Sequence, residues 1–140
     1  MNGDQGDTDG SADEGRGRQV RLAVPATPEY LRLARLTAAG LASRLGFTFD
    51  DVEDLRIAID ELCFCLIGTR GRPGTITLSY RVLPDGLVVE GQGHFEGELP
   101  TFPGLSELSS QILQAVTDEH AVESGPQGTT FRLRKRRTAS

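Results

Sequence analysis

Apolar residues recur at helical spacing in the stretch RIAIDELCFCLIG and in the residues just before it. If this part of the chain is helical, one face of the helix carries Val52, Leu55, Ile59, Leu62 and Leu66. A stripe of this length needs a surface to pack against, so it constrains the fold more than any other stretch. The same helix carries Asp60 and Glu61 in its middle, which raises the question of whether it bears a functional site.

A strand and a further helix are predicted before this stretch. QVRLAV alternates as a strand does, with Val20, Leu22 and Val24 on one face. TPEYLRLARLTAAGLASRLG has helical spacing, with Thr27 as the expected N-cap and Gly46 as the expected left-handed stop. The next helix opens at Thr48, and Asp51 three residues later is typical of a capping box.

The rest of the chain predicts two strands, a helix and two strands. GTITLSYRV and LVVEG alternate around the turn LPDG, LSELSSQILQAV is helical in spacing, and HAVES and TTFRLRKR flank the turn GPQG. This order favours an α+β fold, a two-layer α/β sandwich with helices on one face of a mainly antiparallel sheet. We expect three regions: an acidic, Gly-rich disordered tail (1–18), one domain (19–134) and a basic tail (135–140).

Charge and composition exclude several classes of function. A formal net charge of −5 argues against nucleic acid as the main partner. No apolar run approaches the roughly 20 residues of a membrane-spanning helix, and the N-terminus lacks the pattern of a signal peptide, so we expect a cytoplasmic protein. Lys135 is the only lysine, so a buried catalytic lysine or a P-loop lysine has no candidate.

The cysteine and histidine positions predict no metal site. Cys63 and Cys65 are two apart on a helix and point to nearly opposite sides, so they are interpreted as free thiols. His94 and His120 are far apart in sequence, and no third ligand is patterned near either.

The run VPATPEYLRLARLTAAGLASRLGFTFDDVEDLRIAIDELC resembles the bacterial anti-sigma factor and serine-protein kinase family. The resemblance is close over 24–68 and collinear to Leu133. It implies the ATP-binding fold that this family shares with gyrase and the histidine kinases. It also implies a homodimer that pairs through the first helix and the nearby sheet edge.

Three nucleotide-binding motifs of the family are altered here. The family's Glu is present as Glu61, but the magnesium-binding Asn one turn later corresponds to Cys65, and a thiol is a poor ligand for Mg²⁺. The Asp-x-Gly segment that binds adenine corresponds to Gly91 and Gly93, and the phosphate turn appears only as GLSEL from Gly104. The resemblance therefore implies a degraded nucleotide pocket, with Glu61 as its remnant.

The resemblance implies an anti-sigma regulatory factor that sequesters an alternative sigma factor and is released by an antagonist protein. Arg32 and Arg35, on the first helix, are the candidate partner-binding residues, although each can also be a surface arginine that keeps the helix soluble. The alternative is an active kinase that uses ATP and Mg²⁺ to phosphorylate the antagonist, with Glu61 as base and Asp60 helping to hold the metal. A signalling adaptor without a sigma partner is a third reading. In the first reading no cofactor is required.

Overall fold

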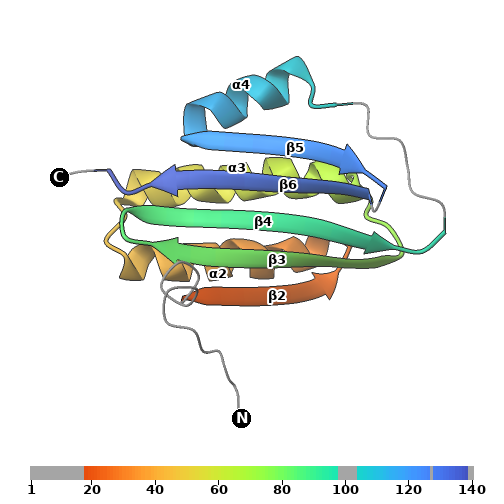
Figure 1. The fold of residues 1–140 in the computed structure, drawn as a ribbon, viewed down its shortest axis with the longest axis horizontal. Helices are drawn as coiled ribbons and strands as arrows, with labels where there is room; N and C mark the ends of the chain where they lie inside the picture. The colour runs from red at the N-terminus through yellow and green to blue at the C-terminus, as the bar shows by residue number, and fades with distance from the viewer. Residues whose placement is uncertain (1–17, 98–103, 127, 139–140) are drawn as a thin grey trace, which may run out of the picture.

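The alternating stretches form one antiparallel sheet, and the helical stretches cover one of its faces (Figure 1). The computed structural model describes residues 18–97, 104–126 and 128–138. Its elements are β2 (Gln19–Pro25), η1 (Pro28–Tyr30), α2 (Leu31–Arg44), α3 (Phe49–Ile67), β3 (Gly74–Leu83), β4 (Gly86–Phe95), α4 (Glu107–Val116), β5 (Glu119–Gly125) and β6 (Gly128–Arg136). The predicted α+β sandwich is confirmed.

The strands lie in the order β2-β3-β4-β6-β5, and every neighbouring pair is antiparallel. The chain leaves β4, passes through α4 to the edge strand β5, and returns as β6 between β4 and β5. Helices α2 and α3 lie behind the sheet in Figure 1, and α4 packs against α3 beside β5. Among the described residues no helix is both long enough and apolar enough to cross a bilayer.

The helix ends follow the predicted signals with two corrections. Gly46 has φ +82° after α2, and the Thr48 hydroxyl accepts a hydrogen bond of 3.1 Å from the Asp51 N–H at the start of α3. Thr27 does not act as a side-chain cap, because a 3-10 turn precedes α2 and the Thr27 hydroxyl is buried without a partner. The Asp51 carboxylate does not complete a capping box either, because it accepts a hydrogen bond from Thr138.

The core lies between the helical layer and the sheet, and it is built from the predicted inward positions. Leu55, Ile59 and Leu62 of α3 are fully buried, and Leu78 and Tyr80 of β3 face them from the sheet layer. Burial, and then the neighbouring Cys63 thiol, raises the pKa of Tyr80, so its phenol stays protonated. The phenol donates a hydrogen bond of 2.9 Å to the carbonyl of Ala34 and so joins α2 to β3.

The C-terminal residues of the chain are anchored to the first turn of α3. The Asp51 carboxylate is buried, accepts a 3.0 Å hydrogen bond from the Thr138 N–H and lies 3.7 Å from Lys135 Nζ. Lys135 also lies 3.4 Å from Asp54. Although burial alone raises the pKa of Asp51, the hydrogen bonds from Thr138 and the charge of Lys135 outweigh it and lower this pKa below 3.8.

We expect the substitution Asp51→Asn to destabilise the protein by about 1–3 kcal/mol at neutral pH, because it removes charge-assisted contacts to a buried group. The native pKa of Asp51 is lowered, so its contribution is complete above pH 3.8 and is lost as the pH falls through the native pKa. Urea unfolding of both proteins from pH 7 to pH 3 measures this difference. Glu53→Gln, which alters an exposed pair with Arg56, is the control and should change stability by less than about 0.5 kcal/mol. A difference that persists unchanged at pH 3 would contradict the account.

Candidate functional site

The second half of α3 brings the predicted site residues Glu61 and Cys65 to one side of the helix, next to α4. They are four residues apart, and the charge of Glu61 acts on the Cys65 thiol. Gly91 and Gly93 lie in β4 on the surface that faces the helices. Gly104 has φ +96° and lies two residues before the N-cap of α4. The roles of these residues in nucleotide binding stay a prediction.

The carboxylate of Glu61 is engaged by a serine from the neighbouring helix. Ser109 Oγ donates a hydrogen bond of 2.8 Å to Glu61 Oε1. Ser109 is held in place by the cap of its own helix, because its N–H donates to Ser106 Oγ at 3.0 Å. One oxygen of Glu61 therefore ties α3 to α4. Sequence reasoning missed this contact, because Glu61 and Ser109 lie 48 positions apart in the chain.

Neither cysteine supplies a metal-binding thiolate at neutral pH. Burial raises the pKa of the half-buried Cys65 thiol, and the negative charge of Glu61 raises it further. Burial raises the pKa of Cys63 even more strongly, because that side chain lies wholly inside the core. Both are free thiols, as predicted, and in the protonated form they are poor ligands for a hard cation such as Mg²⁺.

Two phenyl rings cover the glycines of β4. A Cβ atom placed on Gly91 would lie 2.2 Å from the ring of Phe131, which is its cross-strand partner on β6. A Cβ atom on Gly93 would lie 2.3 Å from the ring of Phe95. Aromatic side chains often cover glycines in sheets in this way, because the ring shields the bare backbone. No side chain fits at either glycine unless the ring moves.

The outer side of the ring of Phe95 is covered in turn. The guanidinium of Arg72 lies 4.4 Å from the ring centroid. Arg72 comes from the loop after α3, whose backbone is fixed by a hydrogen bond of 2.9 Å from the Arg72 N–H to the carbonyl of Ala26. Sequence reasoning missed these aromatic and cationic side chains, because the contact of Phe131 with Gly91 depends on the register of β4 and β6 and the contact of Arg72 with Phe95 depends on the path of the loop after α3.

Arg32 and Arg35 lie in different environments on α2. Arg35 Nη1 is 2.7 Å from Asp60 Oδ1 on α3, and both side chains are partly buried. Arg32 is exposed. The pairing with Arg35 engages one oxygen of the Asp60 carboxylate, which in the kinase alternative helps to hold the metal. Partner binding by Arg32 and Arg35 stays a prediction.

The two histidines lie in separate places. His94 is on the face of the sheet opposite to the helices, whereas His120 Nδ1 is 3.4 Å from Thr117 Oγ1 beside α4. Within residues 18–97, 104–126 and 128–138, no group of three or more His, Cys, Asp or Glu side chains is close enough to hold a metal ion.

We expect the two thiols to differ in reactivity. Iodoacetamide at about pH 8 should alkylate Cys65 more slowly than it alkylates free cysteine, because both burial and Glu61 oppose the thiolate. Cys63 should react only when the protein unfolds. Peptide mass spectrometry of samples labelled with and without urea measures both rates. Rapid labelling of Cys63 in the folded protein would show that α3 is less tightly packed than described.

Comparison with known proteins places the chain in a family. The family model for the histidine kinase-like ATPase domain matches residues 24–135. The serine-protein kinase RsbW of Bacillus pumilus is 35% identical over an alignment of 137 positions, and the alignment covers 83% of this chain and 84% of the relative. The RsbW proteins of Bacillus subtilis and Bacillus velezensis are 38% and 52% identical over shorter stretches, covering 50% and 31% of this chain.

The matched stretches span 46% of the Bacillus subtilis relative and 28% of the Bacillus velezensis relative. The matched range of the family model contains α3, α4 and β4, which carry the site described above. The predicted resemblance is therefore confirmed, and the chain belongs to the histidine kinase-like ATPase domain family as a relative of the serine-protein kinases named RsbW.

Proposed function

We propose that this protein is an anti-sigma regulatory factor that holds an alternative sigma factor by occupancy, without chemistry at its nucleotide site. The observation that carries the proposal is the outer surface of α2. Leu33 and Leu36 on this helix are 44% and 53% exposed, and the exposed Arg32 lies one turn before Leu36. Two outward-facing leucines do not contribute to the core, so they favour contact with a protein partner. We name Arg32, Leu33 and Leu36 the α2 surface.

The contacts around α3 support a function that does not involve phosphoryl transfer. The Glu61 carboxylate is bonded to Ser109, and Asp60 is paired with Arg35. Cys65 offers a protonated thiol where magnesium needs an oxygen ligand. The ring of Phe131 occupies the side-chain position of Gly91, where the family has the Asp that contacts adenine. These residues do not fit bound ATP and Mg²⁺, and we derive no phosphoryl-transfer step through them.

Release then depends on mass action. An antagonist protein that binds a surface overlapping the α2 surface lowers the fraction of protein bound to the sigma factor, in proportion to its concentration and affinity. Such a cycle takes place in the cytoplasm, where RNA polymerase and its sigma factors are located.

We also propose a homodimer that pairs along β2 and the end of α2. The edge strand β2 leaves Val20 39% exposed. Beside it lies a hollow of about 470 Å³ with apolar walls from Val20, Leu41, Leu45 and Val82 and with Arg18 and Arg44 at its rim. An uncovered strand edge next to an apolar hollow is a favourable surface for pairing with a second chain.

The alternative function is an active serine-protein kinase, as the names of the relatives state for those proteins. The presence of Glu61 at the matched position favours it. If the reaction needs both oxygens of each carboxylate, Ser109 has to release Glu61 and Arg35 has to release Asp60. Both changes break contacts that join α3 to its neighbouring helices.

The double substitution Leu33→Asp, Leu36→Asp should weaken binding to the cognate sigma factor by about tenfold or more, because it places charge on the contact surface without changing the core. Leu108→Asp is the matched control, because Leu108 is a 67% exposed leucine on α4 and should change the affinity by less than about twofold. Calorimetric titration with each alternative sigma factor encoded in the same genome measures these affinities.

Circular dichroism of each variant verifies that the fold is intact. Binding that is equally strong in the wild type and in the double variant would contradict the role of the α2 surface. The absence of binding to every alternative sigma factor would contradict the proposed function itself.

A further inference from the structure

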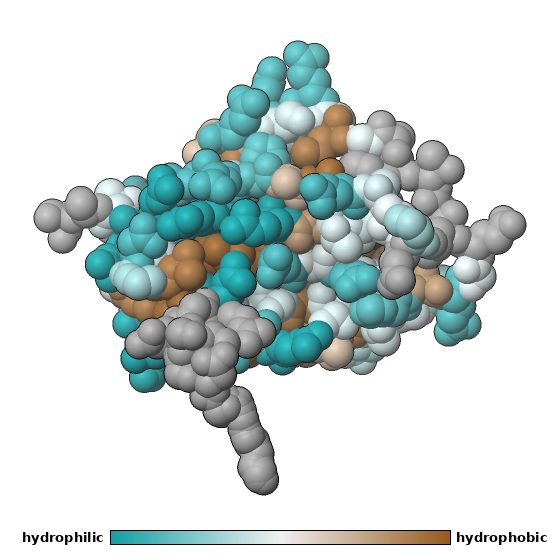
Figure 2. Space-filling model, in the orientation of Figure 1, coloured by the Kyte–Doolittle hydropathy of each residue, from teal (hydrophilic) through white to brown (hydrophobic). Residues whose placement is uncertain are grey.

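The face of the sheet opposite to α2 and α3, here called the open face, carries none of the helices that the structure describes and points toward the reader in Figure 2. Alternate side chains of its strands point outward. They include five arginines: Arg21, Arg81, Arg132, Arg134 and Arg136. A trough of about 570 Å³ crosses this face from Arg21 on β2 to Glu123 on β5, with Ser79, Gln92 and Thr130 on its floor.

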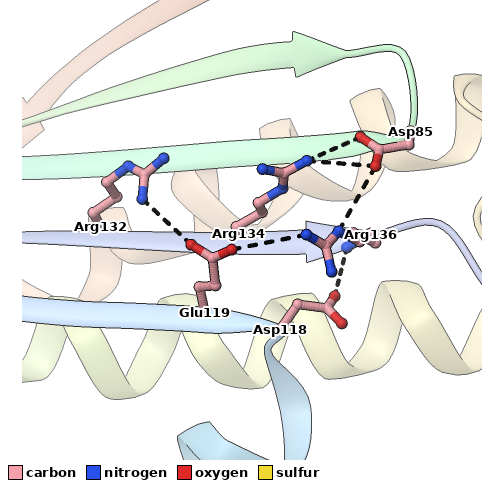
Figure 3. A network of polar contacts seen from close by, with 6 residues as sticks. All are labelled: Asp85, Asp118, Glu119, Arg132, Arg134 and Arg136. Atoms are coloured by element: carbon pink, nitrogen blue, oxygen red, sulfur yellow. Dashed lines mark hydrogen bonds and ion pairs between the residues drawn. The ribbon is translucent and has the colours of Figure 1, made fainter.

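The arginines of β6 are neutralised by acidic neighbours (Figure 3). Arg134 lies 3.3 Å from Asp85. Arg136 lies 3.7 Å from Asp85 and 3.9 Å from Glu119. Arg132 lies 3.8 Å from Glu119 and 4.0 Å from Glu90 on β4. This side of the open face therefore has little free positive charge.

The arginines of β2 and β3 form no such pairs. Arg21 and Arg81 have no ion pair with any residue that the structure describes. The Nε–H group of Arg81 is buried and has no acceptor in the described part of the chain. Gln19 pairs in register with Arg81, and Arg21 pairs with Ser79, so the two guanidiniums come from neighbouring positions of adjacent strands. The β2–β3 corner of the open face therefore carries two positive charges that no carboxylate in the described part of the chain neutralises.

The chain enters the fold at this corner, and the residues before it are acidic. Residues 1–17 contain five acidic side chains, one basic side chain and five glycines. Nearly all of the chain's formal charge of −5 therefore belongs to this segment. Asp13 and Glu14 precede Arg18 by five and four residues, a reach of up to about 17 Å in extended chain. The whole width of the sheet, four strand spacings, is about 19 Å.

We propose that the acidic N-terminal segment, residues 1–17, docks on the β2–β3 corner of the open face and supplies carboxylate acceptors to Arg21 and Arg81. Its attachment at Arg18 gives its carboxylates an effective concentration on the order of millimolar at this corner, which a separate acidic partner has to exceed. Each exposed pair is weak, so docking depends on several charges together and is screened by salt.

Nuclear magnetic resonance of the full-length protein tests the proposal. The arginine Nε–H and backbone amide signals of the wild type are compared with those of a variant in which the segment is neutralised by Asp4→Asn, Asp7→Asn, Asp9→Asn, Asp13→Asn and Glu14→Gln. At low ionic strength this variant should shift the Nε–H signals of Arg21 and Arg81. The signal of Arg56, which is paired with Glu53 on α3, is the internal control and should stay in place.

Two further comparisons complete the test. About 0.5 M salt should reproduce the effect of the neutral variant in the wild type, because it screens exposed charge pairs. In the double variant Arg21→Gln, Arg81→Gln, neutralising the segment should no longer alter the amide signals of β2 and β3. Unchanged Arg21 and Arg81 signals in the neutral variant would overturn the proposal. Shifts that depend on protein concentration would also overturn it, because they would assign the face to a second copy of the chain.

Discussion

The burial of α3 between the sheet, α2 and α4 is the constraint on which the other features depend. Its stripe of Leu55, Ile59 and Leu62 is fully buried against the sheet. Its first turn is fixed by the contacts of Asp51 with Lys135 and Thr138, at the far end of the sequence. A helix held in this way presents Asp60 and Glu61 at fixed positions, and each is then engaged by a side chain from a neighbouring helix.

The same packing that stabilises the fold occupies positions that we propose to correspond to the nucleotide contacts of the family. Phe131 is buried in the core and at the same time covers Gly91, and Phe95 covers Gly93. A substitution such as Gly91→Asp would restore a carboxylate only if the buried ring of Phe131 shifted, because the new Cβ atom would meet that ring at 2.2 Å. A smaller residue at position 131 would give the necessary room, but that change would leave a cavity in the core.

Much of the fold was predictable because helical and alternating patterns depend on near neighbours in sequence. The inward positions of α3 and β3 and the left-handed stop at Gly46 follow from such patterns. Long-range contacts were not predictable. The hydrogen bond between Ser109 and Glu61 spans 48 positions, and the pair of Asp51 with Lys135 requires β6 to run antiparallel beside β4. Thr27 failed as a cap for a local reason, because a 3-10 turn precedes α2.

The predicted site residues show the same difference, because their residue types are visible in the sequence and their contacts are not. Sequence reasoning identified Gly91 as lacking the acceptor side chain of the family's Asp, but the ring that covers it follows only from the pairing of Gly91 with Phe131. It identified Arg35 as a candidate partner-binding residue of α2, but the 2.7 Å contact with Asp60 depends on how α2 packs on α3. The type of each residue was therefore readable from the sequence, whereas the side chain that contacts it was not.

The central claim is that contacts within the chain occupy the nucleotide site. Calorimetric titration of the purified protein with ATP and Mg²⁺ tests it most directly, with RsbW of Bacillus pumilus titrated in parallel as the reference relative. The account predicts no measurable heat for this chain up to about millimolar nucleotide. Saturable binding at micromolar concentration would contradict it, because Glu61, Cys65 and the β4 glycines would then form a working pocket despite the contacts described here.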